Sequence, residues 1–154
     1  MSDEHGELRD LYQELILEHS RHPANFHAMP DATRNVEGDN PLCGDHLRLF
    51  VRLQDGRIAD ISFQGSGCAI SVASASLLTK RIKGETVAEA EALFQRVHRM
   101  LTTEEEAADE PELGELEALT GVRQFPMRVK CATLSWHALR AALQDEATEQ
   151  VSTE

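Results

Sequence analysis

Aromatic, cysteine and basic residues are scarce in this chain, and each shortage excludes some kinds of core, binding partner or cross-link. Aromatic residues make up only 5% of 154 residues, so aliphatic side chains must fill the core of what we expect to be one domain. The 15 lysines and arginines face 27 acidic residues, which gives a formal net charge of −12. Such a protein is a poor binder of nucleic acids and of anionic membranes, because both surfaces are negative.

Long apolar runs and a regular cysteine pattern are also missing. No apolar run approaches the roughly 20 residues that a membrane-spanning helix needs, and residues 1–10 lack a signal-peptide pattern. We therefore expect a cytoplasmic protein. The three cysteines are odd in number, widely spaced and without a CxxC pair. In a reducing compartment this favours free thiols or metal ligation over a disulfide framework.

The order of the expected elements predicts an α+β fold, since the strands come before most of the helices. Alternating residues over 47–53, the turn signal Asp55-Gly56 and a second run over 57–63 predict a β-hairpin. The sheet is expected to be small, antiparallel and about three-stranded, with several helices packed on one face. Helical spacing and capping signals predict helices over 8–20, 69–83, 86–100, 111–119 and 128–147. The region 23–46 is predicted to be mainly loop, with one short strand near 33–37. The tail after the last helix is predicted to be frayed.

An acidic stretch lies between Glu104 and Glu117. One interpretation is a solvated loop and polar helix face, and the other is a docking surface for a basic partner. Both stay open from the sequence.

Each cysteine stands in a distinctive setting. Cys43 lies in a Pro/Gly loop before a strand, where we expect it to be reachable. Cys68 follows two glycines at a predicted helix start, and Cys131 is predicted in the first turn of the last helix, after Arg128 and Lys130. The N-terminus of a helix carries partial positive charge, which favours the thiolate form that binds metals and attacks sulfur.

Asp45 adds a fourth candidate ligand, because residues two apart in an extended segment point to the same side. Three thiolates and one carboxylate suit a tetrahedral Zn²⁺, and thiolates also hold iron–sulfur clusters. Free cysteines are often only small buried hydrophobes, so the residue types alone leave both interpretations open. The histidines are interpreted as surface residues or as facing away from the cysteines: His19, His22, His27, His46, His98 and His137.

These segments resemble the SufU/IscU/NifU-N-terminal family of iron–sulfur cluster assembly proteins over residues 8–145. The resemblance is carried by the opening helix from Leu11-Tyr12 to His22-Pro23 and by three cysteine motifs, at 40–45, 65–71 and 128–131. It implies a single SufU/IscU-like domain over 1–154. Lys130 stands where IscU-type scaffolds have a histidine, and an acidic insertion lies at about 101–121. Both features look like the SufU branch.

The resemblance implies a zinc-dependent sulfurtransferase that accepts persulfide sulfur from a SufS-type cysteine desulfurase, a carrier of the transferase class rather than an independent turnover enzyme. Cys43 would be the sulfur acceptor and Arg128 an assisting residue, unless Arg128 is only a solvated residue at a helix start. Downstream SUF scaffold proteins are further expected partners. The alternatives are a scaffold that holds iron or a [2Fe–2S] cluster, and a structural zinc module. The implied metal ligands are Cys43, Asp45, Cys68 and Cys131.

Overall fold

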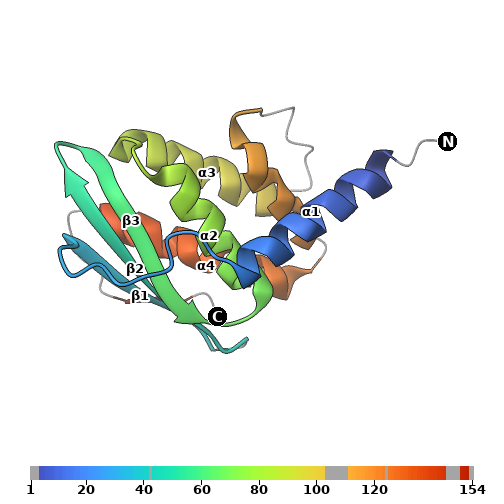
Figure 1. Ribbon diagram of the computed structural model, residues 1–154, viewed down its shortest axis with the longest axis horizontal. Helices are drawn as coiled ribbons and strands as arrows, with labels where there is room; N and C mark the ends of the chain where they lie inside the picture. Colours follow the sequence, from blue (N-terminus) through green and yellow to red (C-terminus); the bar gives the residue numbers. More distant parts are fainter. Residues whose placement is uncertain (1–3, 42, 103–110, 124, 145–149, 153–154) are drawn as a thin grey trace.

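One β-sheet with helices gathered on one of its faces forms the architecture of the chain (Figure 1). The computed structural model describes residues 4–41, 43–102, 111–123, 125–144 and 150–152. The elements in chain order are α1 (Glu4–Arg21), β1 (Arg34–Asn40), β2 (Asp45–Gln54), β3 (Arg57–Ser66), α2 (Ala69–Ile82), α3 (Val87–Thr102), the 3₁₀ helix η1 (Pro111–Val122), α4 (Pro126–Leu143) and β4 (Gln150–Ser152). The predicted α+β class is confirmed.

The sheet has the strand order β3-β2-β1-β4. Strands β1, β2 and β3 pair antiparallel, as predicted, and the hairpin turns at Asp55 and Gly56 with φ angles of 53° and 75°. These positive φ values are the backbone conformation that the Asp-Gly signal anticipated. The predicted loop over 23–46 was partly wrong, because β1 extends to Asn40. The tail predicted as frayed also contributes β4, which pairs parallel to β1.

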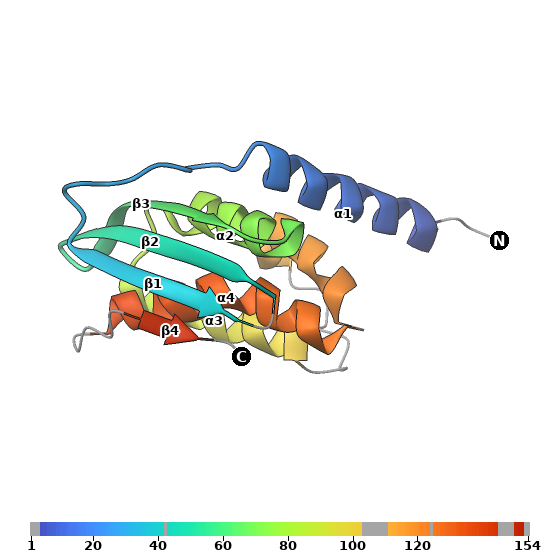
Figure 2. The same cartoon turned by 90° about the horizontal axis from the view of Figure 1, so that it is seen from below.

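Helices α2 and α4 lie directly on the sheet, α2 against β3 and α4 against β1 and β2. Helix α1 packs on α2 and η1, and α3 packs on α4, so α1 and α3 lie on opposite sides of the α2–α4 pair (Figure 2). The core between these layers is largely aliphatic, as the scarcity of aromatics predicted. The one tryptophan, Trp136, is buried in α4, and its Nε1 donates to Ser74 Oγ of α2 at 3.2 Å.

Small side chains along α2 allow close approach from both sides. Ser74 Oγ donates to the carbonyl of Ala132 in α4 at 2.6 Å. On the α1 side, Ser76 Oγ accepts from the backbone N–H of Ala24 at 2.7 Å and pairs with His19 Nδ1 at 2.7 Å. His19 is therefore buried between helices, and its prediction as a surface histidine was wrong.

The capping box predicted at the start of α3 is present. The backbone N–H of Thr86 donates to Glu89 Oε1, and the N–H of Glu89 donates to Thr86 Oγ1, both at 3.1 Å. These two bonds satisfy amide donors that the first turn of a helix leaves unpaired.

No helix within the described ranges is both long and apolar enough to span a membrane.

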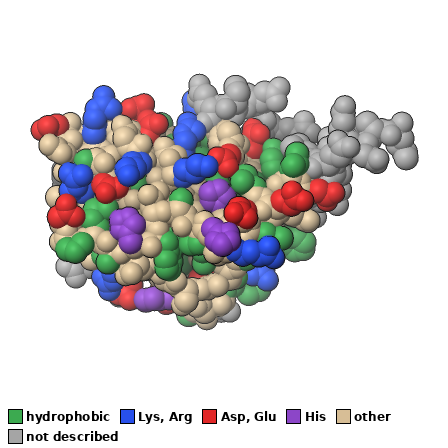
Figure 3. All heavy atoms as spheres, in the orientation of Figure 1, with side chains coloured by type: hydrophobic (Ala, Val, Ile, Leu, Met, Phe, Trp, Pro, Cys, Tyr) green, Lys and Arg blue, Asp and Glu red, His purple; other side chains and the backbone are tan. Residues whose placement is uncertain are grey.

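The acidic stretch is described only from residue 111 onward, so the segment 103–110 lies outside the described residues. In η1, Glu115 accepts a 2.9 Å bond from Lys80 Nζ, and Glu117 accepts one from the Tyr12 hydroxyl at 3.3 Å. These two carboxylates are thus engaged in bonds within the chain. On the face seen in Figure 3, acidic and basic side chains are interspersed. The acidic insertion at about 101–121 stays a prediction.

Candidate metal centre

Three separate segments bring the cysteines to one end of the sheet. Cys43 lies in the turn between β1 and β2, Cys68 lies between β3 and α2 and is separated from β3 by Gly67, and Cys131 lies in α4. Ligand atoms of Cys43, Asp45 and Cys131 all lie within 4.8 Å of one another. Residues almost 90 positions apart in sequence therefore meet through the packing of α4 on β1 and β2.

Asp45 connects this group to the remaining cysteine. Its side chain is fully buried at the first position of β2. Asp45 Oδ1 accepts a 2.8 Å bond from the backbone N–H of Cys68, and Asp45 Oδ2 lies 3.8 Å from Cys68 Sγ. The structure therefore brings together all four predicted ligands, with the carboxylate between the thiols.

The turn that carries Cys43 is tighter than the sequence predicted. The backbone N–H of Cys43 donates to the carbonyl of Asn40 at 3.2 Å, and Gly44 has a φ of 72°. The segment is thus a hairpin turn, and the argument from an extended conformation was wrong. Cys43 and Asp45 still converge, because the left-handed residue between them reverses the chain.

Gly67 leaves the space that Asp45 occupies. A Cβ atom at position 67 would lie 2.5 Å from Asp45 Oδ1 and 3.0 Å from its Cα atom. These separations are shorter than real Cβ contacts, so any side chain would displace the carboxylate. The glycine before Cys68 is therefore a requirement of the site.

Cys68 forms the N-cap of α2, where its Sγ accepts from the backbone N–H of Ser71 at 3.4 Å. Its prediction at a helix start is confirmed. Cys131 differs from the prediction, because α4 begins at Pro126 and Cys131 is therefore in the second turn. Burial raises the pKa of the Cys131 thiol well above its ordinary range, and hydrogen bonds to Asp45, Cys43 and Cys68 raise it further. In the metal-free chain this thiol is protonated at neutral pH.

Arg128 lies over the cysteines from the first turn of α4. Electrostatic attraction to Cys68 and a hydrogen bond with it raise the pKa of the guanidinium, and Cys131 and Cys43 add smaller effects. The side chain is exposed, so it reaches the thiols from the solvent side. A cation in this position can attract an anionic sulfur group.

Asn40 is a site residue to which the sequence assigned no role. It is fully buried at the end of β1, and its Nδ2 lies 3.9 Å from Cys131 Sγ. The sequence signals for it were its place just before Pro41 and its position at the start of the motif 40–45. The geometry expected for His46 is confirmed, since its imidazole pairs with Glu37 at 2.9 Å on the exposed side.

The donor set fits a divalent zinc ion. Bond lengths of about 2.0 Å to oxygen and 2.3 Å to sulfur set ligand atoms roughly 3.3–3.8 Å apart in a tetrahedral site. The 3.8 Å separation of Cys68 Sγ and Asp45 Oδ2 is close to the roughly 3.5 Å that these bond lengths set for a sulfur–oxygen pair. A buried carboxylate beside thiols is costly when ionised, and a cation would offset that cost.

The NifU-like N terminal domain model matches residues 11–147. The chain belongs to this family. The family predicted from the three cysteine motifs is thereby confirmed, and the SufU/IscU-like segment accounts for nearly all of the chain.

Two relatives and one solved structure place the chain within the NifU-like family. The zinc-dependent sulfurtransferase SufU of Bacillus subtilis is 40% identical over 139 residues, which cover 90% of this chain and 93% of SufU. The iron-sulfur cluster assembly scaffold protein IscU of Streptococcus pyogenes is 40% identical over 149 residues, 97% of this chain and 92% of IscU. A SUF-system protein of Fervidobacterium islandicum has a TM-score of 0.79 at 34% identity, and the match covers 85% of this chain and 95% of that one.

Proposed function

We propose that this chain is an iron–sulfur cluster assembly protein that acts as a zinc-dependent sulfurtransferase. The observation that carries the proposal is the donor set, in which three thiols surround one buried carboxylate. No imidazole joins this group among the described residues. Lys130, the neighbour of the third cysteine, is exposed and leaves the set without a nitrogen ligand. The ligands would be Cys43, Asp45, Cys68 and Cys131.

Bound zinc would keep these thiols deprotonated at neutral pH without taking part in redox chemistry. The protein needs such help, because burial alone drives the Cys131 thiol toward its protonated form. Asn40 and the N–H of Ser71 donate to the sulfur atoms of Cys131 and Cys68 and fix their orientation.

Cys43 is the thiol best suited to accept sulfur. Cys131 is fully buried, and Cys68 is fixed by hydrogen bonds at both its N–H and its sulfur. Cys43 is half-buried in a turn. Its thiolate would attack the outer sulfur of a desulfurase persulfide, so a new sulfur–sulfur bond forms, the old one breaks, and the desulfurase cysteine leaves as a thiolate.

Arg128 is proposed to assist this transfer. Its guanidinium lies at the exposed side of the thiols, where an incoming persulfide would approach. It would attract the anionic sulfur by charge and by hydrogen bonding. A SufS-type cysteine desulfurase is the proposed sulfur donor, and scaffold proteins of the SUF system are the proposed recipients.

A desulfurase assay with cysteine, run with and without this protein, tests the proposal. The wild-type protein should accelerate sulfide release and contain one zinc ion per chain by elemental analysis. Cys43→Ser should lose the acceleration, whereas Arg21→Gln in α1 should behave as wild type. If Cys43→Ser accelerates the desulfurase fully, Cys43 is not the acceptor.

The same preparations distinguish the scaffold alternative, which the IscU relative favours. A scaffold loaded with a [2Fe–2S] cluster absorbs visible light and contains iron and inorganic sulfide, whereas a zinc protein is colourless. A zinc protein with no effect on the desulfurase would instead indicate a structural module.

A further inference from the structure

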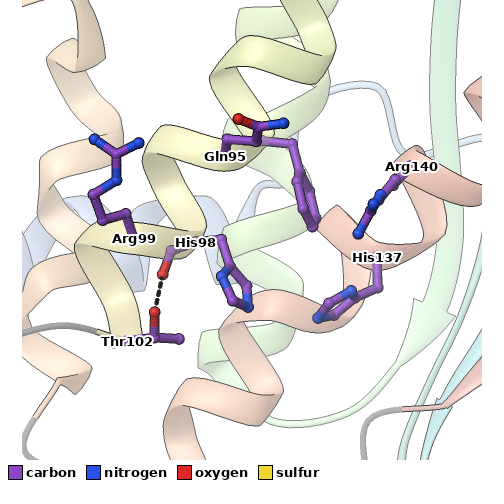
Figure 4. Close-up of a pocket in the computed structure, with 7 residues that line it drawn as sticks. Gln95, His98, Arg99, Thr102, His137 and Arg140 are labelled. Carbon is purple, nitrogen blue, oxygen red and sulfur yellow. Dashed lines mark hydrogen bonds between the residues drawn. The ribbon is translucent and has the colours of Figure 1, made fainter.

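A cavity lies between α3 and α4, away from the cysteines (Figure 4). Its volume is about 350 Å³, which is within the range of small-molecule sites. Neither the metal centre nor the packing of the core uses it. The residues that line it are Phe94, Gln95, His98, Arg99, Thr102, His137 and Arg140.

Two histidines face each other across this cavity, His98 from α3 and His137 from α4 (Figure 4). Their ring centroids are 5.8 Å apart, and both rings contact Phe94. Both side chains are partly buried, yet neither imidazole has a hydrogen-bond partner among the residues that the structure describes. Polar groups in such a position normally bind something, so these rings are available to a ligand.

The charged side chains among the described residues that line the cavity are those of two arginines. Arg140 stacks over Phe94 with its guanidinium carbon 5.4 Å from the ring centroid, and it extends toward His137 (Figure 4). Burial lowers the pKa of His137, and the charges of His98 and Arg140 lower it further. Among the residues that the structure describes, no carboxylate lines this cavity, and Glu91 lines only the smaller hollow beside it.

The cavity is separate from the metal centre, although both use α4. His137 and Arg140 follow Cys131 by six and nine residues, which corresponds to about 240° and 180° of helical rotation. Arg140 therefore projects from the side of α4 opposite Cys131. Ligands of the two sites cannot compete by direct contact.

We propose that this cavity binds a small organic oxyanion, held by Arg140, His98 and His137. Guanidinium and imidazole donors match the oxygens of a phosphate or carboxylate group, and the flat Phe94 and histidine rings suit an organic ligand. A second metal ion fits poorly, because only two imidazoles would bind it and Arg140 would repel it.

Phenyl phosphate and benzoate are matched probes, since they share a ring and differ in the anionic group. Each is titrated into the zinc-loaded full chain and followed by imidazole NMR and calorimetry. At least one probe should shift the His98 and His137 resonances, and the tighter probe identifies the preferred group. Arg140→Gln should weaken that binding by about tenfold or more, while zinc content and desulfurase activation stay as in wild type.

Two matched controls make the test decisive. Arg21→Gln removes one positive charge from α1, which contributes no residue to the cavity, and should leave the affinity unchanged. Benzyl alcohol keeps the ring without the charge and should not bind. The proposal is overturned if neither anion shifts the two histidines at millimolar concentration, if benzyl alcohol binds equally well, or if both arginine variants weaken binding to the same extent.

Discussion

Individual residues at the metal centre are held by contacts that leave little space for change. Asp45 sits between the Cys68 backbone and the Gly67 Cα atom, with no room for a Cβ atom at position 67. The carboxylate is thus oriented by its neighbours before any metal binds, and a preorganised ligand loses less entropy on binding.

Gly67→Ala should therefore weaken zinc binding while leaving the fold in place. The new methyl group would push Asp45 Oδ1 out of position, and changes around metal ligands typically cost about 10–100-fold in affinity. Competition with a chromogenic zinc chelator measures the effect. Gly121→Ala is the matched control, since a Cβ atom at position 121 meets nothing within 4 Å. Equal affinities for the two variants would show that the contact with Asp45 is unimportant.

The sequence predicted which residues form the site better than how they meet. Motifs around the cysteines pointed to the four candidate ligands, but their convergence depends on the packing of α4 against the sheet. The prediction of a low thiol pKa at Cys131 was wrong. Helix α4 starts at Pro126, so Cys131 lies in its second turn, where burial raises the pKa by more than the helix N-terminus lowers it. Such a balance depends on tertiary structure, which residue spacing does not contain.

Among the elements, α2 is central, because both α1 and α4 pack on its small residues. His19 joins α1 to α2 through its bond to Ser76, and its other nitrogen lies 3.8 Å from Glu115 of η1. Desolvation lowers the pKa of His19, with Glu115 acting in the opposite direction. The folded protein therefore binds a proton at this position less readily than the unfolded chain does.

This difference predicts acid sensitivity of the α1 packing. As the pH falls through the ordinary histidine pKa of about 6.5, the unfolded chain gains a proton at His19 that the folded chain resists, so stability decreases. His19→Gln should reduce the loss of melting temperature between about pH 7.5 and pH 5.5. The control is His22→Gln, at an exposed histidine. This variant keeps His19 and the candidate metal centre, so its melting temperature should fall with pH as much as that of the wild type. The same loss in both variants would exclude His19 as the cause.

Helix α4 also supplies a direct contact to the sheet through Leu134, which is fully buried and faces Gly38 of β1. Leu134→Ala would leave a cavity there and should lower the free energy of unfolding by about 2–5 kcal/mol. Urea denaturation measures it. Leu11→Ala, at a side chain that is 61% exposed, should change stability by no more than about 0.5 kcal/mol. A similarly small change in the free energy of unfolding for both variants would mean that α4 moves toward β1 and fills the cavity.

The elements with strong local signals were the ones that the sequence predicted best. The Asp55-Gly56 turn and the capping box of Thr86 and Glu89 each specify a backbone conformation over a few residues. Strand β4 was missed because three residues contain too little pattern, and its pairing depends on the distant edge of β1. The buried place of His19 was missed for the same reason, since its partner lies 57 residues away.

For the whole molecule, the dominant electrostatic property is the net charge of −12. Like charges on a folded protein repel one another, and salt screens them with a Debye length of about 10 Å at 0.1 M. Sodium chloride should therefore raise the melting temperature. A variant with Asp10→Asn and Glu14→Gln, both exposed on α1, should respond less to salt. A melting temperature that does not depend on salt would argue against net repulsion.

Strand β4 pairs with Glu37, Gly38 and Asp39 along the outer edge of β1, next to the turn that carries Cys43. At the opposite edge, Phe63 of β3 bridges to Phe26 and Arg57 bridges to Thr86. Open edges recruit strands from other molecules, so these pairings protect the protein from polymerisation. A purification tag at the C-terminus that displaces β4 would expose the edge of β1. Aggregates of such a preparation would then reflect the tag, and an N-terminal tag on α1 is the safer choice.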